Sequence, residues 1–376
     1  MLKFDIKKKS GLARVGVIHT PHGDIKTPAF VGAATRATVK ALTFTEMNAL
    51  GSQAILANTY HLFLAPGSEL ISKAGGLSSF MNWQKPTFTD SGGFHIFSLP
   101  NVKIDETGAK FKSHIDGRSF EMTPELSMET QWQIGADIHM AFDQLAKSDS
   151  HEDMEIAMER THRWLDRCIE KNNDLKQSYL SNGLPEQYLY AVVQGGTFLD
   201  LREKSARFEA EKDVDGFGIG GVFTADGMGE MLKVVCPILP ENKPRHLLGM
   251  GQEPIDLFVG AEFGCDTFDC VGPTRLARNG SLYTPDGRIN IKNARFRDDF
   301  SPVVEGCDCE CCKNHTRAYL HHLFKVDEIT AKVLASIHNE HFVVSVVDKI
   351  RESLENDTFK AYKKEFLDHY YASKAQ

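Results

Sequence analysis

The sequence is poor in long apolar runs, in N-terminal hydrophobic residues and in positive charge. No apolar run is long enough to span a bilayer, which excludes a membrane helix. The first residues, from Met1 to Lys7, lack the apolar segment of a signal peptide, so we expect a cytoplasmic protein with no membrane partner. A formal net charge of -8 argues mildly against nucleic acid as a partner unless basic residues cluster locally.

The sequence instead shows a regular alternation of short apolar runs, polar or glycine-rich turns, and helical patterns. A length of 376 residues suits one large α/β barrel or two ordinary domains. Eight runs have the residue types of buried strands. They cover residues 28–31, 54–57, 86–89, 138–142, 189–193, 216–219, 246–248 and 267–268. Strands alternating with helices in this number predict an α/β fold, a (β/α)8 TIM barrel that spans residues 1–376 as a single catalytic domain.

Polar or small residues close seven of these runs or soon follow them. In chain order they are Asn58, Asp90, Asp143, Gln194, Gly221, Gly249 and Asp269. In a (β/α)8 barrel the carboxyl ends of the strands form the active-site mouth, so these residues should converge there. Any one of them could be a helix cap or a turn residue instead. A shared site explains all of them together better than separate caps do.

Four of the eight cysteines fall within six positions, namely Cys307, Cys309, Cys311 and Cys312. Without a secretion signal, such a cluster indicates a metal site rather than a disulfide framework. The pattern Cys307-x-Cys309-x-x-Cys312 offers three thiolates to a tetrahedral Zn²⁺, and a histidine would complete the set. Spacing alone does not choose among the histidines that follow, which are His315, His321, His322, His338 and His341.

A helix is expected from about residue 327 to residue 354, with Asp327 as its N-cap and apolar residues at helical spacing. Together with the cysteines it would form a zinc-binding subdomain, at about residues 300–350, packed against the barrel. This segment is too small to be an independent domain.

The stretch from Arg275 to Arg297 is basic although the chain as a whole is acidic. Its six cations are Arg275, Arg278, Arg288, Lys292, Arg295 and Arg297, and only Asp286 opposes them. A basic patch beside a catalytic mouth would suit a phosphate backbone. The alternative is an ordinary solvated charged face.

Several motifs follow one another along nearly the whole chain. They are Thr38-Val39-Lys40-Ala41-Leu42, Asn58-Thr59-Tyr60-His61-Leu62, Asp90-Ser91-Gly92-Gly93-Phe94, Val193-Gln194-Gly195-Gly196, Gly220-Gly221, Phe268-Asp269-Cys270-Val271, Pro273-Thr274-Arg275-x-x-Arg278-Asn279-Gly280 and the cysteine pattern. In this order they resemble the motifs of the tRNA-guanine transglycosylases of bacterial type.

The resemblance implies a (β/α)8 barrel with a structural zinc, acting as a homodimer on the anticodon loop of tRNA. It implies that Asp269 is the nucleophile and Asp90 the general acid/base. Substrate-binding positions would be Gly92, Gly93, Phe94, Asp143, Gln194 and Gly221. RNA-binding positions would be Lys40, Arg275 and Arg278. The implied zinc ligands are Cys307, Cys309, Cys312 and His338.

The implied reaction exchanges a guanine base for a 7-deazaguanine through a covalent aspartyl-ribose intermediate, as part of queuosine biosynthesis. Substitution at an anomeric carbon by two carboxylates is chemically similar to retaining glycoside hydrolysis. It needs no ATP, nicotinamide or catalytic metal. A carboxylate such as Asp143 suits the N1–H and amino donors of guanine, and the base must leave the stack to reach the mouth.

The incoming base is either preQ1, which carries an aminomethyl group, or the bulkier queuine. This chain has Gln144 and Leu145 where bacterial members usually have Glu and Cys, His95 where Gln is usual, and Thr224 in the stretch beside the base. The missing negative charge at residue 144 would weaken selection for the amine of preQ1. Two further alternatives are a barrel N-glycoside hydrolase and a non-catalytic RNA-binding subunit.

Overall fold

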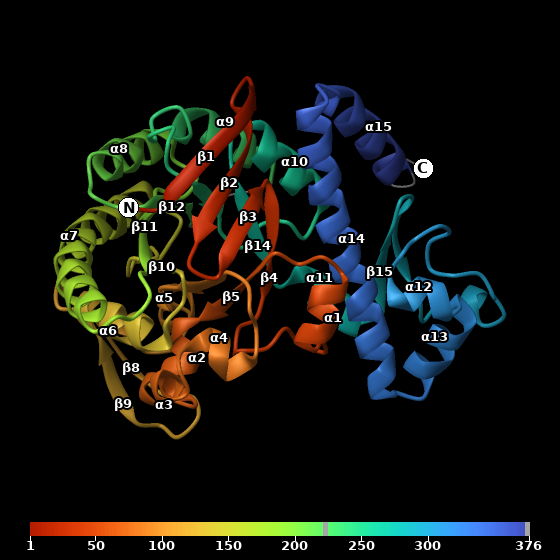
Figure 1. The fold of residues 1–376 in the computed structure, drawn as a ribbon, viewed down its shortest axis with the longest axis horizontal. Coiled ribbons are helices and arrows are strands. Elements are labelled where there is room, and N and C mark those ends of the chain that lie inside the picture. Colours follow the sequence, from red (N-terminus) through yellow and green to blue (C-terminus); the bar gives the residue numbers. More distant parts are fainter. Residues whose placement is uncertain (221–224, 373–376) are drawn as a thin grey trace.

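A closed barrel of eight parallel strands forms the centre of the computed structural model, which describes residues 1–220 and 225–372 (Figure 1). Each predicted apolar run overlaps one barrel strand, so the predicted (β/α)8 barrel is confirmed. The strands are β4 (Ala29–Ala33), β5 (Ala54–Asn58), β6 (Thr87–Asp90), β10 (Ile138–Met140), β11 (Tyr188–Val193), β12 (Gly216–Ile219), β13 (Arg245–Leu247) and β14 (Thr267–Cys270). β14 pairs with β4 and closes the barrel.

Helices surround the barrel, and short helices lie in several of its loops. The elements of the first half are α1 (Phe44–Ala49), α2 (Thr59–Leu64), α3 (Ser68–Lys73), α4 (Leu77–Met81), α5 (Gly93–Phe97), α6 (Pro124–Ile134) and α7 (His151–Ser181). Those of the second half are α8 (Leu199–Ala210), α9 (Ala225–Val235), α10 (Pro254–Glu262) and α11 (Gly272–Arg278). No helix of the described residues is long and apolar enough to cross a membrane.

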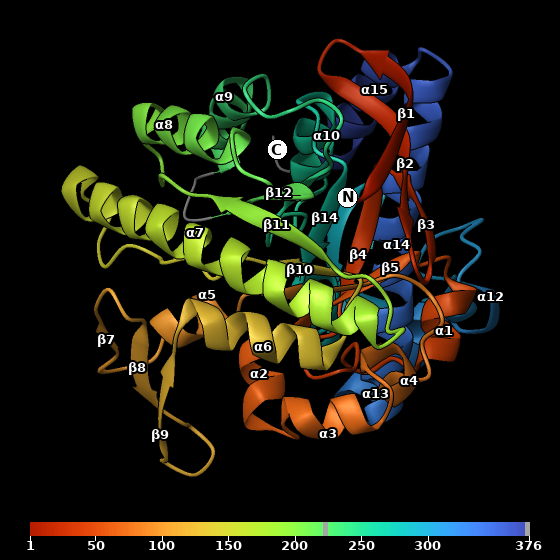
Figure 2. The same cartoon turned by 60° about the vertical axis from the view of Figure 1, so that its left-hand side comes forward.

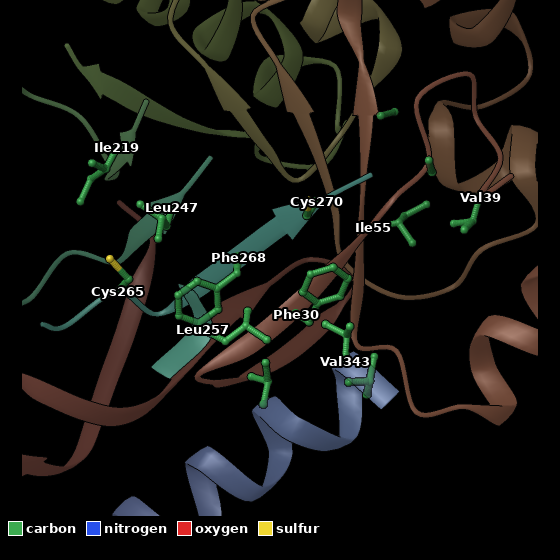
Figure 3. Packing of buried hydrophobic residues seen from close by; sticks show 14 of the residues in the cluster. Phe30, Val39, Ile55, Ile219, Leu247, Leu257, Cys265, Phe268, Cys270 and Val343 are labelled. Atoms are coloured by element: carbon green, nitrogen blue, oxygen red, sulfur yellow. The ribbon is translucent and has the colours of Figure 1, made fainter. Parts of the chain in front are cut away.

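Side chains of the barrel strands alternate between two hydrophobic cores, as the period of two requires. On β4, Phe30 belongs to the outer core, which Figure 3 shows together with Phe268 of β14, Leu257 of α10 and Val343 of α14 (Ile329–Glu355). The next residue, Val31, belongs to the inner core. The inner core also contains Leu2 and residues of an N-terminal antiparallel sheet, including Phe4, Ile18 and Ile25.

Three small antiparallel sheets, two of three strands and one of two, were not predicted. The N-terminal sheet consists of β1 (Lys3–Ser10), β2 (Ala13–Thr20) and β3 (Gly23–Thr27). It contributes to the core inside the barrel, so it closes the end of the barrel at which the strands begin. The second sheet consists of β7 (Lys103–Ile104), β8 (Ala109–Lys112) and β9 (Ser119–Met122), and it projects from the barrel beside α6 (Figure 2).

The C-terminal segment wraps the cysteine cluster and covers one side of the barrel. It contains β15 (Ser281–Thr284), β16 (Gly287–Asn290), a 3₁₀ turn (Ala294–Phe296), α12 (Glu310–Asn314), α13 (Arg317–Lys325), α14 (Ile329–Glu355) and α15 (Phe359–Tyr371). α14 contacts β4 as well as α11, α12 and α13. The predicted long helix is confirmed as α14. The expected N-cap is wrong: Asp327 has a left-handed φ of 55°, and Glu328 is the N-cap.

Candidate active site

The ends of β5 and β6 place Asn58 and Asp90 opposite each other in the barrel sheet. The Nδ2 of Asn58 donates to both carboxylate oxygens of Asp90, at 2.9 Å and 2.7 Å. The backbone N–H groups of Gly92 and Thr59 donate to Oδ1 at 2.9 Å and 3.3 Å. Burial, with a smaller contribution from the negative charge of Asp269, nevertheless raises the pKa of Asp90 to about 7. At neutral pH this carboxyl group can therefore both give and take a proton.

Asp269 lies on β14 and its side chain is 12% exposed. Its Oδ1 accepts a hydrogen bond from the backbone N–H of Gly249, at 2.9 Å, and lies 3.1 Å from Nε2 of His246. The other ring nitrogen of the fully buried His246 contacts Thr267 Oγ1 at 2.8 Å. These contacts fix the direction of one carboxylate oxygen and leave Oδ2 without a hydrogen-bond partner among the described residues, which suits an attacking group.

Asp143 follows β10 and is buried among polar partners from two other strand ends. Ser91 Oγ donates to its Oδ1 at 2.7 Å, and Gln194 Nε2 donates to its Oδ2 at 2.5 Å. Burial raises the pKa of Asp143 above its ordinary value. The two residues predicted to recognise the base, Asp143 and Gln194, therefore meet in the structure. The third, Gly221, and also Thr224, lie outside the described residues.

Gly92 and Gly93 sit where the chain turns from β6 into α5 under close contacts. Gly92 has a φ of 78°, and a Cβ there would lie 2.8 Å from the backbone nitrogen of Tyr60. A Cβ on Gly93 would lie 2.7 Å from the carbonyl oxygen of Asp143. Close packing therefore explains why both positions are occupied by glycine. Phe94, the next residue, is 64% exposed, so its ring is free to contact a ligand.

The candidate RNA-binding cations differ in their surroundings. Arg275 and Arg278 lie on α11, which follows directly from the strand that carries Asp269. Nη1 of Arg278 is buried and has no hydrogen-bond partner within the described part of the chain. Lys40 is exposed in the loop after β4. Arg288, by contrast, pairs with Glu253 at 2.9 Å, so the basic stretch is not one uniform surface.

Three cysteines and one histidine gather into a cluster that could hold a metal ion. One ligand atom each from Cys307, Cys309, Cys312 and His338 lies within 4.8 Å of all the others. His338 Nδ1 is 3.6 Å from Cys309 Sγ and 3.3 Å from Cys312 Sγ. A tetrahedral ion with ordinary zinc bond lengths would set S···N separations of about 3.6 Å.

The surroundings of this cluster support the same ligand set. His338 Nε2 is 2.7 Å from the carbonyl oxygen of Tyr283, which orients Nδ1 toward the thiols. His341 Nδ1 lies 3.7 Å from Cys307 Sγ, outside the set. His321 is turned to the carbonyl of Ile291. The geometry therefore separates His338 from its competitors, which spacing alone could not do.

The structure changes the interpretation of Gln144. Its Oε1 accepts a hydrogen bond from Arg160 of α7 at 2.7 Å, and Arg160 also pairs with Glu106 at 2.8 Å. The Gln144 side chain therefore points into the contact with α7. A glutamate at this position would meet the same arginine rather than a ligand. The structure therefore does not support the argument that Gln144 removes a negative charge from beside the 7-substituent of the incoming base.

Sequence reasoning missed two residues of this site. His246 falls within a predicted strand and His95 departs from a family motif, but neither pattern predicts a role in the site. The nearest signal for His246 is its place in the predicted strand at residues 246–248, because the strands of a barrel lead to the active-site mouth. No spacing in the sequence indicates that His95 contacts Asn58, at 2.8 Å between Nδ1 and Nδ2.

The chain matches the family model described as queuine tRNA-ribosyltransferase over residues 8–372. It is 45% identical over 372 residues to the queuine tRNA-ribosyltransferase of Herpetosiphon aurantiacus, with 98% of this chain and 92% of the relative covered. The corresponding protein of Desulforamulus reducens is 44% identical, with 97% of each chain covered. That of Bacillus subtilis is 43% identical, with 96% and 94% covered.

Proposed function

This chain belongs to the queuine tRNA-ribosyltransferase family, and we propose that it is a tRNA-guanine transglycosylase that replaces the wobble guanine of tRNA with the 7-deazaguanine preQ1, in queuosine biosynthesis. The observation that supports this best is a pair of carboxylates in contrasting environments. Burial gives Asp90 a pKa of about 7, whereas Asp269 accepts a backbone hydrogen bond at 2.9 Å. One acid is suited to proton transfer and the other to attack.

In the first step, a carboxylate oxygen of Asp269 attacks C1′ of the ribose, and the bond between C1′ and N9 of guanine breaks. The base leaves with that electron pair and takes a proton from Asp90. In the second step, the incoming base gives its N9 proton to Asp90 and attacks C1′, displacing the Asp269 carboxylate. Two displacements restore the original configuration at C1′, and both acids return to their starting states.

The base would bind between the Asp143 carboxylate and the exposed ring of Phe94. Asp143 accepts from N1–H and the exocyclic amine of guanine, and Gln194 serves the O6 edge. The motif Gly220-Gly221 implies that the backbone of Gly221 also contacts the O6 edge of the base. Gly92 and Gly93 allow the turn after β6 to approach the base closely. Since these contacts address the part common to guanine and 7-deazaguanines, they recognise both partners of the exchange.

The RNA backbone would contact Arg275, Arg278 and Lys40. The unpartnered Nη1 of Arg278 supports this assignment, because a buried guanidinium nitrogen without an acceptor is costly unless a ligand supplies one. Each cation would neutralise one phosphate and contribute to the salt dependence of binding.

The metal in the Cys307, Cys309, Cys312 and His338 cluster would be zinc with a structural role, because three thiolates and one imidazole form a closed set. When bound, it would hold α12 and α14 together in a subdomain of about residues 300–350, within the single barrel domain. A homodimer acting in the cytoplasm is part of the same proposal.

One incubation separates this proposal from its alternatives. Labelled guanine should enter tRNA without ATP, and unlabelled preQ1 should then displace it. Release of guanine without replacement would indicate an N-glycoside hydrolase, and binding without exchange would indicate an RNA-binding subunit. Competition between preQ1 and queuine for the same tRNA decides the incoming base. A kcat/KM for queuine equal to or above that for preQ1 would establish the queuine alternative.

A further inference from the structure

The side-chain amide of Asn58 lies between Asp90 and His95, and its orientation is fixed. Its Oδ1 accepts from the backbone N–H of His61 at 3.0 Å, a group that can only donate. Nδ2 must therefore face the other way, toward Asp90 at 2.7 Å and 2.9 Å and toward Nδ1 of His95 at 2.8 Å. One of the two amide hydrogens points to each partner.

This arrangement also fixes the state of His95. Since Nδ2 of Asn58 only donates, Nδ1 of His95 must present a lone pair, and the imidazole is neutral with its hydrogen on Nε2. We propose that His95 is a positioning residue of the transfer reaction: as a neutral acceptor, it holds the Asn58 amide in the plane that presents Nδ2 to Asp90. This inference rests on the proposed role of Asp90 as the acid/base.

Aromatic contacts hold the His95 ring in place. Tyr60 of α2 lies almost parallel to it, with ring centroids 6.2 Å apart and an interplanar angle of 8°. His61 meets it edge-on at 4.9 Å, and Phe94 does so at 5.6 Å. Aromatic residues of both α2 and α5 therefore pack against the His95 ring.

The charged and titratable groups around His95 favour its neutral form. His61 lies against it, and His114 follows at 5.9 Å from His61, with its Nδ1 2.6 Å from the Tyr60 hydroxyl. Arg36 and Lys40, in the loop after β4, add positive charge, and the pKa of His61 falls to about 4 through burial and these neighbours. Burial also lowers the pKa of His95. Asp90 faces this group through Asn58, which lies between the carboxylate and His95.

Protonation of His95 would place two N–H donors against each other at 2.8 Å. The Asn58 amide would have to move, and Asp90 would lose the hydrogen bond that does most to lower its pKa. The pKa of Asp90 would rise, and the acid/base would spend less time ionised. Acidification should therefore impair the reaction through His95 in addition to its direct effect on the two aspartates.

The test compares His95→Leu, which removes the acceptor, with His95→Gln, which keeps an acceptor that cannot titrate. His95→Leu should lower kcat by about 3- to 10-fold, the range expected for one neutral hydrogen bond, with KM for tRNA unchanged. His95→Gln should keep kcat at neutral pH and show a shallower acid limb than wild type. His19→Gln, in the N-terminal sheet, is the matched control and should keep the wild-type profile.

A double-mutant cycle separates positioning from packing. Asn58→Ser keeps an N-cap for α2 but lacks the amide, so adding His95→Leu to it should cause no further loss of kcat. Equal losses in both backgrounds, or an acid limb of His95→Gln that coincides with wild type, would overturn the inference. Since the acid limb is measured on His95→Gln, the test stands even if His95→Leu fails to fold. Full exchange activity in Asp90→Asn would instead overturn the assignment of Asp90 as acid/base.

Discussion

The raised pKa of Asp90 should appear in the pH dependence of stability, which Asp90→Asn can reveal. An ordinary Asp has a pKa of 3.8, and burial raises that of Asp90 to about 7 in the folded protein. Between these values the folded state holds a proton that the unfolded state has released. Stability contributed by this group therefore falls as pH rises, from a maximum below the unfolded pKa to a minimum above the folded one.

The size of the effect follows from the two pKa values. One pKa unit corresponds to about 1.4 kcal/mol, so between about pH 5 and about pH 8 the wild-type protein should lose about 2.5 kcal/mol through Asp90 alone. Asp90→Asn lacks this pH-dependent contribution to stability, because the asparagine side chain does not titrate. Its altered hydrogen bonds with Asn58 and Gly92 add a constant that cancels when the two pH values are compared.

Urea unfolding of wild type and Asp90→Asn at the two pH values measures this difference. The free energy of unfolding of Asp90→Asn, relative to wild type, should be higher at the alkaline value by about 2.5 kcal/mol. Groups that titrate in both proteins, such as Asp143, drop out of the comparison. The same free-energy difference at both pH values would refute the reasoning, because it would mean that Asp90 titrates alike in the folded and unfolded chains.

Four further results are expected. Elemental analysis should find about one zinc per chain in the wild type, and Cys309→Ser should lose it and unfold at lower temperature, since a structural zinc site contributes folding energy; wild type without zinc would contradict the assignment. Asp269→Asn should abolish the denaturation-resistant protein–RNA adduct while leaving tRNA binding intact, and an undiminished adduct would mean another nucleophile. Arg278→Ala should raise KM for tRNA and reduce the slope of log binding constant against log salt concentration by about one. Unchanged tRNA kinetics would indicate that Arg278 belongs to an ordinary solvated surface rather than to the RNA-binding face. Gln144→Glu should leave the ratio of kcat/KM for preQ1 and queuine within about twofold, because Arg160 would take the new charge; a clear gain for preQ1 would restore that position to the pocket.

The barrel was predictable because its strands are buried on both faces. Such strands are continuous apolar runs, and each overlapped a predicted run. The antiparallel sheets were missed for the opposite reason. β1 carries five Lys or Ser residues among its eight and is mostly exposed or half-exposed, so its few buried positions gave a weak pattern. The extra sheet after α5 is built from strands of two to four residues, shorter than any periodicity can identify.

The cluster of three cysteines and His338 shows which part of a candidate metal site the sequence specifies. Three ligands lie within six residues, so local spacing predicts them. The fourth lies on α14, and its selection depends on which face of that helix is turned toward the loop. The carbonyl of Tyr283, 55 residues earlier, fixes the ring of His338. His341, one turn later, reaches only Cys307. Such a choice depends on tertiary packing, which spacing does not contain.

The two catalytic candidates show why strand register is essential to the proposed mechanism. Each aspartate is oriented by the strand that pairs with its own. Asn58 is the register partner of Asp90 on β5, and His246 is the partner of Thr267, two residues before Asp269 on β14. A shift of one residue in either pair would turn the orienting side chain to the opposite face of the barrel. The contrasting environments of Asp90 and Asp269 therefore depend on the closed barrel holding both registers at once. A substitution that loosens β5 or β13 should impair the exchange even where it touches neither carboxylate.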